Sequence, residues 1–89
     1  MKVLINFEVT KGYEQWKSVV KEHEAKIEGL GVKIIWLGAE KNNPKKVHVC
    51  FECESLEKLE ENMKRPEIAA LRELAGRIEE STVVIPLVD

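Results

Sequence analysis

The chain has 89 residues, of which 44% are apolar and 34% are charged, a composition that fits one domain with a buried core and excludes a disordered tail. No apolar run approaches the roughly 20 residues that a membrane-spanning helix needs, so we expect a soluble protein with no membrane partner. The formal net charge is -2, and lysine and glutamate are interspersed, so no basic stripe is available to bind a nucleic acid.

Residues 2–9 are predicted to form the first strand. Apolar residues alternate along it, at Val3, Ile5, Phe7 and Val9, with the period of two that is typical of a strand. Polar residues at positions 6 and 8 interrupt this run before it reaches the length of a signal peptide. We therefore expect a cytoplasmic protein.

The next segments predict a helix followed by a hairpin. From residue 13 to residue 30 the apolar residues recur at helical spacing, which predicts one continuous helix that glycines at 29 and 31 end. Residues 32–39 and 46–53 alternate again, and only a turn over residues 40–45 separates them, so they should pair as an antiparallel hairpin. Strict alternation places Trp36 on the side of the helices and Leu37 on the opposite side.

The C-terminal third predicts two short helices and a last strand. Ser55 fits the N-cap of a helix, and Pro66 cannot continue that helix, so a second helix should begin there and end at Gly76. Residues 80–88 read as a strand, in which alternation places Val83 and Ile85 with the helices.

The element order is therefore βαββαβ in a single domain over residues 1–89. This order is typical of the ferredoxin-like α+β fold, a four-stranded antiparallel sheet with the helices on one face. The open face of that sheet is also largely apolar, and its predicted residues are Leu4, Ile35, Leu37, Cys50, Val84, Pro86 and Val88. A second copy would bury this face by two-fold symmetry, so we expect a homodimer through the open sheet face.

Short motifs along nearly the whole chain resemble a known group of proteins. They are Tyr13–Lys17, His23–Glu24, Gly31–Val32, the Asn43–Pro44 turn before Val47–Val49, Glu54–Lys58, Arg65–Glu67 and Ala75–Gly76. Together they resemble the dimeric α+β barrel superfamily, and most closely its small antibiotic-biosynthesis-monooxygenase-like and cyclase-like members. The resemblance implies the architecture and dimerisation. Some members oxidise aromatic compounds without a metal or flavin, others degrade haem and others only bind small molecules.

Three residues are candidates for binding a ligand. Trp16 is followed seven residues later by His23, a pattern that resembles pocket-facing positions of the superfamily, and two helical turns bring both side chains to one face. His23 would donate or accept a hydrogen bond, while Trp16 and Trp36 would form flat walls for a planar ligand. The alternative is that His23 bonds a backbone carbonyl or water at the core edge and that both tryptophans fill the core. The motifs carry over no full catalytic set, so the catalytic residues stay unknown.

No metal or other cofactor is expected. His48, Cys50 and Cys53 match a metal-binding pattern, but on a continuous strand Cys53 points away from the other two, so the three cannot converge on one ion.

Two classes of function remain open. The first is a protein that binds a small aromatic or carbonyl compound between the helices and the sheet, with a cofactor-independent monooxygenase or a cyclase-like enzyme as its catalytic form. The second is a non-catalytic dimerisation module with a filled core. A cavity above about 300 Å³ near His23 would favour the first class, and continuous packing the second.

Overall fold

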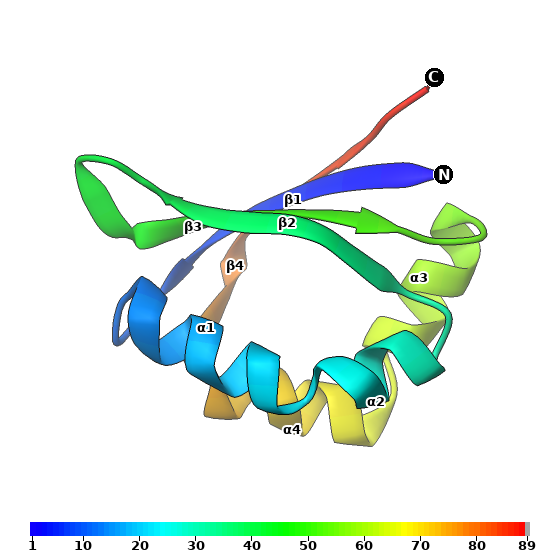
Figure 1. The fold of residues 1–89 in the computed structure, drawn as a ribbon, viewed down its shortest axis with the longest axis horizontal. Helices are drawn as coiled ribbons and strands as arrows, with labels where there is room; N and C mark the ends of the chain where they lie inside the picture. The colour runs from blue at the N-terminus through cyan, green and yellow to red at the C-terminus, as the bar shows by residue number, and fades with distance from the viewer. Residues whose placement is uncertain (89) are drawn as a thin grey trace.

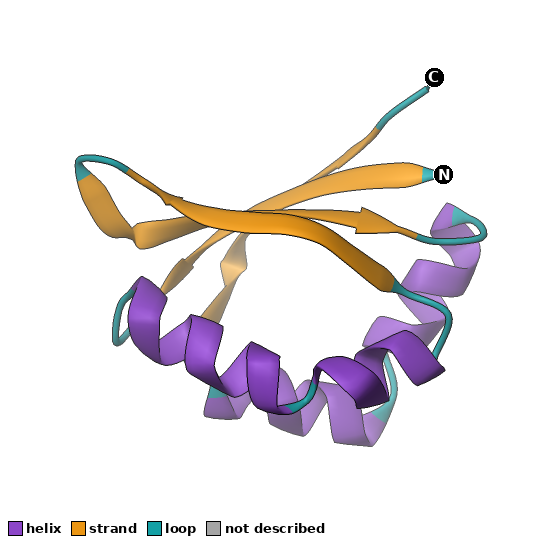
Figure 2. Cartoon of the chain, viewed as in Figure 1, coloured by secondary structure: helices purple, strands orange, loops and turns teal. Residues whose placement is uncertain are grey.

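A computed structural model describes residues 1–88 of the chain. Its elements are, in order, β1 (Lys2–Val9), α1 (Tyr13–Glu22), α2 (Glu24–Gly29), β2 (Lys33–Glu40), β3 (Asn43–Glu52), α3 (Leu56–Met63), α4 (Pro66–Leu74) and β4 (Arg77–Pro86). The strands form one antiparallel sheet in the order β2-β3-β1-β4. All of these helices lie on one face of the sheet (Figures 1 and 2), so the predicted ferredoxin-like α+β fold is confirmed.

The core lies between the central strands and the helices. The inward residues of β1 alternate as predicted and are buried against α1, which contributes Trp16, Val19 and Val20. In α3 the Ser55 side chain accepts a hydrogen bond from the backbone N–H of Lys58, as an N-cap does, and Pro66 begins α4. None of the helices within residues 1–88 is long and apolar enough to cross a membrane.

The first predicted helix is interrupted at His23, which ends α1 and precedes α2 with a non-helical backbone (φ -110°, ψ 10°). Its Nδ1 lies 2.9 Å from the carbonyl oxygen of Val19, and a carbonyl only accepts, so the ring donates this bond. In a continuous helix that carbonyl would accept the backbone N–H of residue 23. The N–H bonds to the carbonyl of Val20 instead, at 3.1 Å, and the helix breaks.

A one-residue bulge in β2 overturns the predicted faces of that strand. Ile34 pairs with Phe51, but Trp36 pairs with the next residue, Cys50, so Ile35 is an extra residue. After the bulge the alternation is inverted. Trp36 is 49% exposed on the open face, and Leu37 packs on the core. The predictions that Trp36 faces the helices and that Leu37 lies on the open face are therefore wrong.

The faces of β4 also differ from the prediction, because its pairing with β1 is irregular. In β1, Asn6 pairs with Val83 and Glu8 pairs with Ile78, so β4 carries extra residues between these two pairs. The Ser81 hydroxyl closes the irregular segment, because it accepts the N–H of Glu8 at 2.8 Å and donates to the carbonyl of Ile78 at 2.6 Å. Val83 therefore lies on the open face.

The same register corrects three further predictions. Ile85 pairs with Leu4 and joins the open face, whereas Val84 pairs with Ile5 and Pro86 with Val3 on the side of the helices. At the other end of β4, Arg77 pairs with Val9 and also faces the helices.

Gly76 is the second of the two residues, after Ala75, that join α4 to β4. Its backbone has φ 80°, a region that residues with a Cβ rarely adopt, and a Cβ built there would lie 2.5 Å from the side-chain oxygen of Thr10. Its carbonyl accepts the N–H of Thr10 at 2.8 Å. The next residue, Arg77, is thereby fixed at the start of β4.

Candidate ligand-binding cavity

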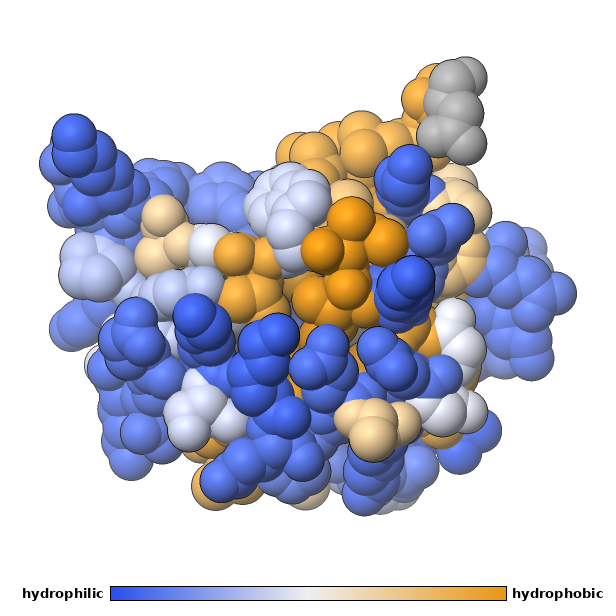
Figure 3. All heavy atoms as spheres, viewed as in Figure 1, coloured by the Kyte–Doolittle hydropathy of each residue, from blue (hydrophilic) through white to orange (hydrophobic). Residues whose placement is uncertain are grey.

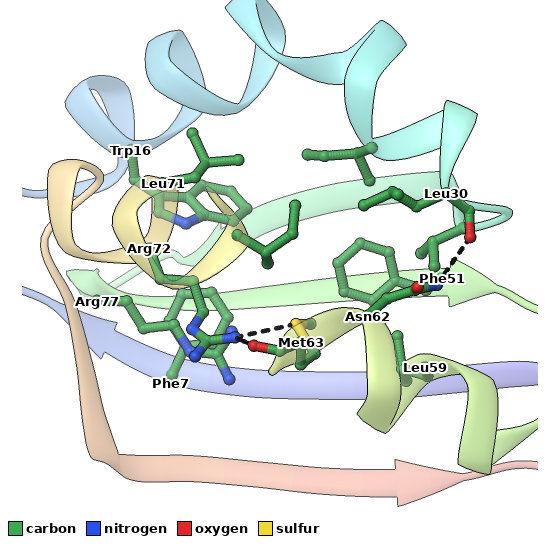
Figure 4. Close-up of a pocket in the computed structure, with 13 residues that line it drawn as sticks. Phe7, Trp16, Leu30, Phe51, Leu59, Asn62, Met63, Leu71, Arg72 and Arg77 are labelled. Carbon is green, nitrogen blue, oxygen red and sulfur yellow. Dashed lines mark hydrogen bonds between the residues drawn. The ribbon is translucent and has the colours of Figure 1, made fainter. Parts of the chain in front are cut away.

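A cavity of about 80 Å³ lies between the helices and the sheet (Figure 4). Its apolar lining includes Phe7 from β1, Phe51 from β3, Trp16 from α1 and Leu59 from α3. Only three of its lining residues are polar, namely Asn62, Arg72 and Arg77. The lining thus combines an apolar wall with a few hydrogen-bond donors, the composition that is usual for small-molecule sites.

The aromatic wall is built around Trp16, which is buried on the inner face of α1. Its ring meets that of Phe7 edge to face, with centroids 5.6 Å apart and planes at 66°, and lies 6.0 Å from the ring of Tyr13. These contacts hold the indole against the sheet. Burial raises the pKa of the Tyr13 hydroxyl, which donates a 3.4 Å hydrogen bond to the carbonyl of Leu37.

Asn62 is the buried polar residue of α3 and is only 9% exposed. Its Nδ2 donates to the carbonyl oxygen of Leu30 at 2.7 Å and ties α3 to the end of α2 (Figure 4). The Oδ1 atom has no partner within residues 1–88, and every fully buried side-chain polar atom there has one. The Oδ1 atom is therefore within reach of water or of a ligand.

Two guanidinium groups lie at the α4–β4 side of the cavity. Arg72 donates through Nε to Glu79 at 2.7 Å and through Nη1 to the carbonyl and the sulfur of Met63 (Figure 4). The Cζ of Arg77 lies 4.4 Å from the centroid of the Phe7 ring, a cation–π arrangement. Nε and Nη2 of Arg77 both donate to the hydroxyl of Thr82, at 3.3 and 3.2 Å.

The charge of Arg77 is only partly compensated. Its side chain is 9% exposed, and its Nε is 4.0 Å from the nearest carboxylate oxygen, on Glu79. Burial lowers the pKa of Arg77 to about 10, Glu79 opposes this change, and the charge of Arg72 adds to it. The guanidinium is charged at neutral pH, so it places a positive charge in a largely apolar site.

A second hollow of about 290 Å³ adjoins the cavity on the side of Val84 in β4. The two spaces share Leu59, Met63, Arg72 and Arg77, which therefore form the wall between them. Neither volume alone reaches the roughly 300 Å³ at which sites for drug-sized ligands begin.

The three predicted ligand-binding residues do not come together. Trp16 lines the cavity. His23 lines a separate surface hollow of about 160 Å³, beside Lys26 and Leu74, and its ring bonds a backbone carbonyl. Trp36 lies on the opposite face of the sheet because of the bulge.

The sequence patterns did not indicate Asn62, Arg72 or Arg77 as site residues. A signal for one of them was present, because Asn62 follows Leu59 by three positions and so shares the apolar face of α3.

The cysteines and His48 do not form a metal site. Cys50 is buried opposite Leu4, and Cys53 follows the strand, with its carbonyl accepting a 2.9 Å bond from the N-terminal ammonium. His48 instead pairs with Glu40 at 2.8 Å. Across the described part of the chain, no three His, Cys, Asp or Glu side chains gather in a way that could hold a metal ion.

No protein-family model and no curated protein sequence matches the chain. Solved structures do match it over nearly its full length. Three of them are provisionally named antibiotic biosynthesis monooxygenases. The Bordetella bronchiseptica protein has a TM-score of 0.72 and 12% identity, over 99% of this chain and 96% of its own. The Caulobacter crescentus protein has a TM-score of 0.71 and 16% identity, over 99% of this chain and 89% of its own. The Bacteroides thetaiotaomicron protein has a TM-score of 0.70 and 17% identity, over 100% of this chain and 88% of its own.

At these identities the comparison establishes the fold. The chain has the α+β fold of the antibiotic-biosynthesis-monooxygenase-like proteins. The predicted resemblance to the antibiotic-biosynthesis-monooxygenase-like proteins is therefore confirmed at the level of the fold. Fold does not fix activity, so the function has to be argued from the cavity.

Proposed function

We propose that the protein binds a small aromatic or carbonyl compound in the cavity between the helices and the sheet. The observation that carries this proposal is the placement of Arg77, a charged side chain that is 9% exposed beside an aromatic wall. Burying a guanidinium whose nearest carboxylate lies 4.0 Å away is costly, and its contacts with Phe7 and Thr82 offset only part of that cost. A ligand oxygen bound there would repay that cost.

The chemistry of the polar groups sets what the cavity can do. Arginine N–H groups stabilise negative charge on oxygen, such as the charge on an enolate or phenolate. A cofactor-independent monooxygenase or cyclase-like reaction on such a compound is therefore the enzymatic form of the proposal. Oxygen consumption with a phenolic substrate is the first activity to assay.

We also propose that the protein acts as a homodimer through the open face of the sheet. Trp36, Val83 and Ile85 lie there with exposures of 49%, 47% and 43%. Figure 3 shows apolar surface over the middle of the sheet and towards the C-terminus, and hydrophilic surface over the β2–β3 turn and over the helices below the sheet. Monomers rarely expose contiguous apolar patches of this kind, and a second copy would cover it.

One observation favours the alternative of a dimerisation module without a ligand. The cavity of about 80 Å³ is smaller than ordinary ligand sites, and the hollow beside His23 measures about 160 Å³. Binding then requires side chains of the shared wall, which Leu59, Met63, Arg72 and Arg77 form, to move so that the cavity and the adjoining hollow merge.

Benzamide, a small neutral aromatic carbonyl compound, distinguishes the two candidates. The two tryptophans offer separate indole N–H signals in NMR spectra, one from the cavity and one from the opposite face. We expect a benzamide titration to shift the Trp16 signal in a saturable way and to leave the Trp36 signal in place.

A cavity-filling variant supplies the control. Ile27→Phe adds bulk to the lining and should weaken benzamide binding, whereas Ile35→Phe makes the same change in the bulge of β2 and should not. Absence of a saturable Trp16 shift up to the solubility limit would favour the module without a ligand.

A further inference from the structure

The charged residues that line the cavity are both cations, namely Arg72 and Arg77, and no carboxylate lines it. The anion that contacts both is Glu79, which lines the adjoining hollow but not the cavity itself. It is 2.7 Å from Nε of Arg72 and 4.0 Å from Nε of Arg77, and its side chain is 56% exposed. One partly solvated carboxylate therefore serves two guanidinium groups, which leaves one positive charge in excess.

Other charged groups nearby do not remove this excess. Glu60 and Lys64 line the adjoining hollow, but both are exposed and they carry opposite charges. Glu73 lies beside the arginines at the outer surface, where it is also exposed. Water screens such exposed groups far more than it screens the buried guanidinium of Arg77.

Both arginines keep donors in reserve. A guanidinium has five N–H bonds, on Nε, Nη1 and Nη2. Arg77 donates hydrogen bonds through Nε and Nη2. Arg72 donates through Nε and Nη1. Nη1 of Arg77 and Nη2 of Arg72 have no acceptor among the described residues. Since no fully buried side-chain nitrogen there lacks one, both atoms are open to an incoming molecule.

From this arrangement we infer that the ligand is a monoanion with an aromatic body, a small aromatic carboxylate whose oxygens bind Arg77 and Arg72. The inference rests on the proposed function, because it specifies the ligand of the same cavity. A carboxylate matches the fork of an arginine and carries the single charge that the site lacks. The aromatic body would occupy the space beside Phe7, Trp16 and Phe51.

Benzoate and benzamide form the matched pair that tests the inference. They have the same shape and differ at neutral pH by one charge. We expect benzoate to bind the wild-type protein at least about tenfold more tightly than benzamide, as followed by the Trp16 indole signal. In its hydrogen bonds to the arginines both donor and acceptor are ionised, whereas the benzamide carbonyl is neutral.

Three variants locate the charge. Arg72→Gln and Arg77→Gln should each remove most of the preference for benzoate while benzamide still binds. Arg65→Gln removes an exposed charge that pairs with Glu67 and should leave the preference intact. If Arg77→Gln does not fold, the affinities of Arg72→Gln and of the wild type for benzoate and benzamide still test the inference.

The outcomes separate the inference from the proposed function. Equal affinity for benzoate and benzamide would overturn the carboxylate inference and leave the ligand cavity standing. A preference that survives both Arg72→Gln and Arg77→Gln would also overturn it. Failure of both compounds to shift the Trp16 signal would overturn the proposed function and the inference with it.

Discussion

Replacing Arg77 with methionine should stabilise the fold. Burial lowers the pKa of this guanidinium well below its ordinary value, to about 10, so folding disfavours its charged form. Methionine has a similar length and no charge to bury, and it can pack against Phe7. Stabilisation by this substitution is expected if Arg77 is retained for binding a ligand rather than for the stability of the fold.

The size of the effect follows from opposing contributions. A pKa lowered by more than two pH units corresponds to roughly 3 kcal/mol of destabilisation at neutral pH, at about 1.36 kcal/mol for each unit. Loss of the contact with the Phe7 ring and of the bond to Thr82 would offset about 2 kcal/mol of it. We therefore expect a gain of about 1 kcal/mol, which raises the melting temperature by roughly 4–8 °C.

The dependence on pH gives a second measurement of the same effect. Below pH 10 Arg77 is charged in both the folded and the unfolded chain, so the cost of burial is fully present. As pH rises above about 10 the folded protein loses the proton before the unfolded chain does, and that cost begins to fall. The stability gap between Arg77→Met and the wild type, from urea unfolding, should therefore narrow between pH 8 and pH 11. A variant less stable than the wild type at pH 8 would refute this reasoning.

The remaining predictions concern the dimer, the cysteines and His23. Trp36→Asp should halve the light-scattering mass of the protein, whereas Leu37→Asp should unfold it because that side chain packs on the core. A wild-type mass of one chain at micromolar concentration would rule out the dimer. Burial raises the pKa of the Cys53 thiol, so native protein should react slowly with iodoacetamide at pH 8 and quickly once unfolded. Replacing Cys50 and Cys53 with serine should leave the metal content unchanged, and stoichiometric zinc lost on that replacement would contradict this. His23→Ala should lower the unfolding free energy by about 1 kcal/mol and leave benzamide affinity unaltered, because its ring bonds a carbonyl away from the cavity. Lost binding at unchanged stability would instead assign His23 to the site.

The order of the elements could be predicted because each has several apolar residues at a regular spacing. The errors lie where one residue breaks that regularity. The extra residue Ile35 inverts the faces of Trp36 and Leu37, and the side chain of His23 breaks a helix whose apolar spacing continues beyond it. A bulge or a side-chain bond to the backbone leaves no periodic signal, so alternation alone cannot reveal it.

The candidate site was less predictable than the fold. Trp16 was found because a large aromatic residue on an apolar helix face is visible in the sequence. Asn62, Arg72 and Arg77 were missed because polar residues on short helices and at strand starts usually face water. What places Arg77 inside is its register opposite Val9, which depends on tertiary pairing.

The position of Arg77 in the cavity depends on Gly76, a residue that has no side chain. Because it turns the chain between α4 and β4 with φ 80° and passes close to Thr10, Gly76→Ala would strain the backbone and press on that threonine. A rotation of the first residues of β4 would relieve the backbone strain, and it would carry the Arg77 guanidinium away from the Phe7 ring. Such a variant could keep every residue that lines the cavity and still lose the charge that distinguishes it. In searches for proteins with the proposed binding preference, a glycine directly before the arginine is therefore a feature to look for beside the arginine itself.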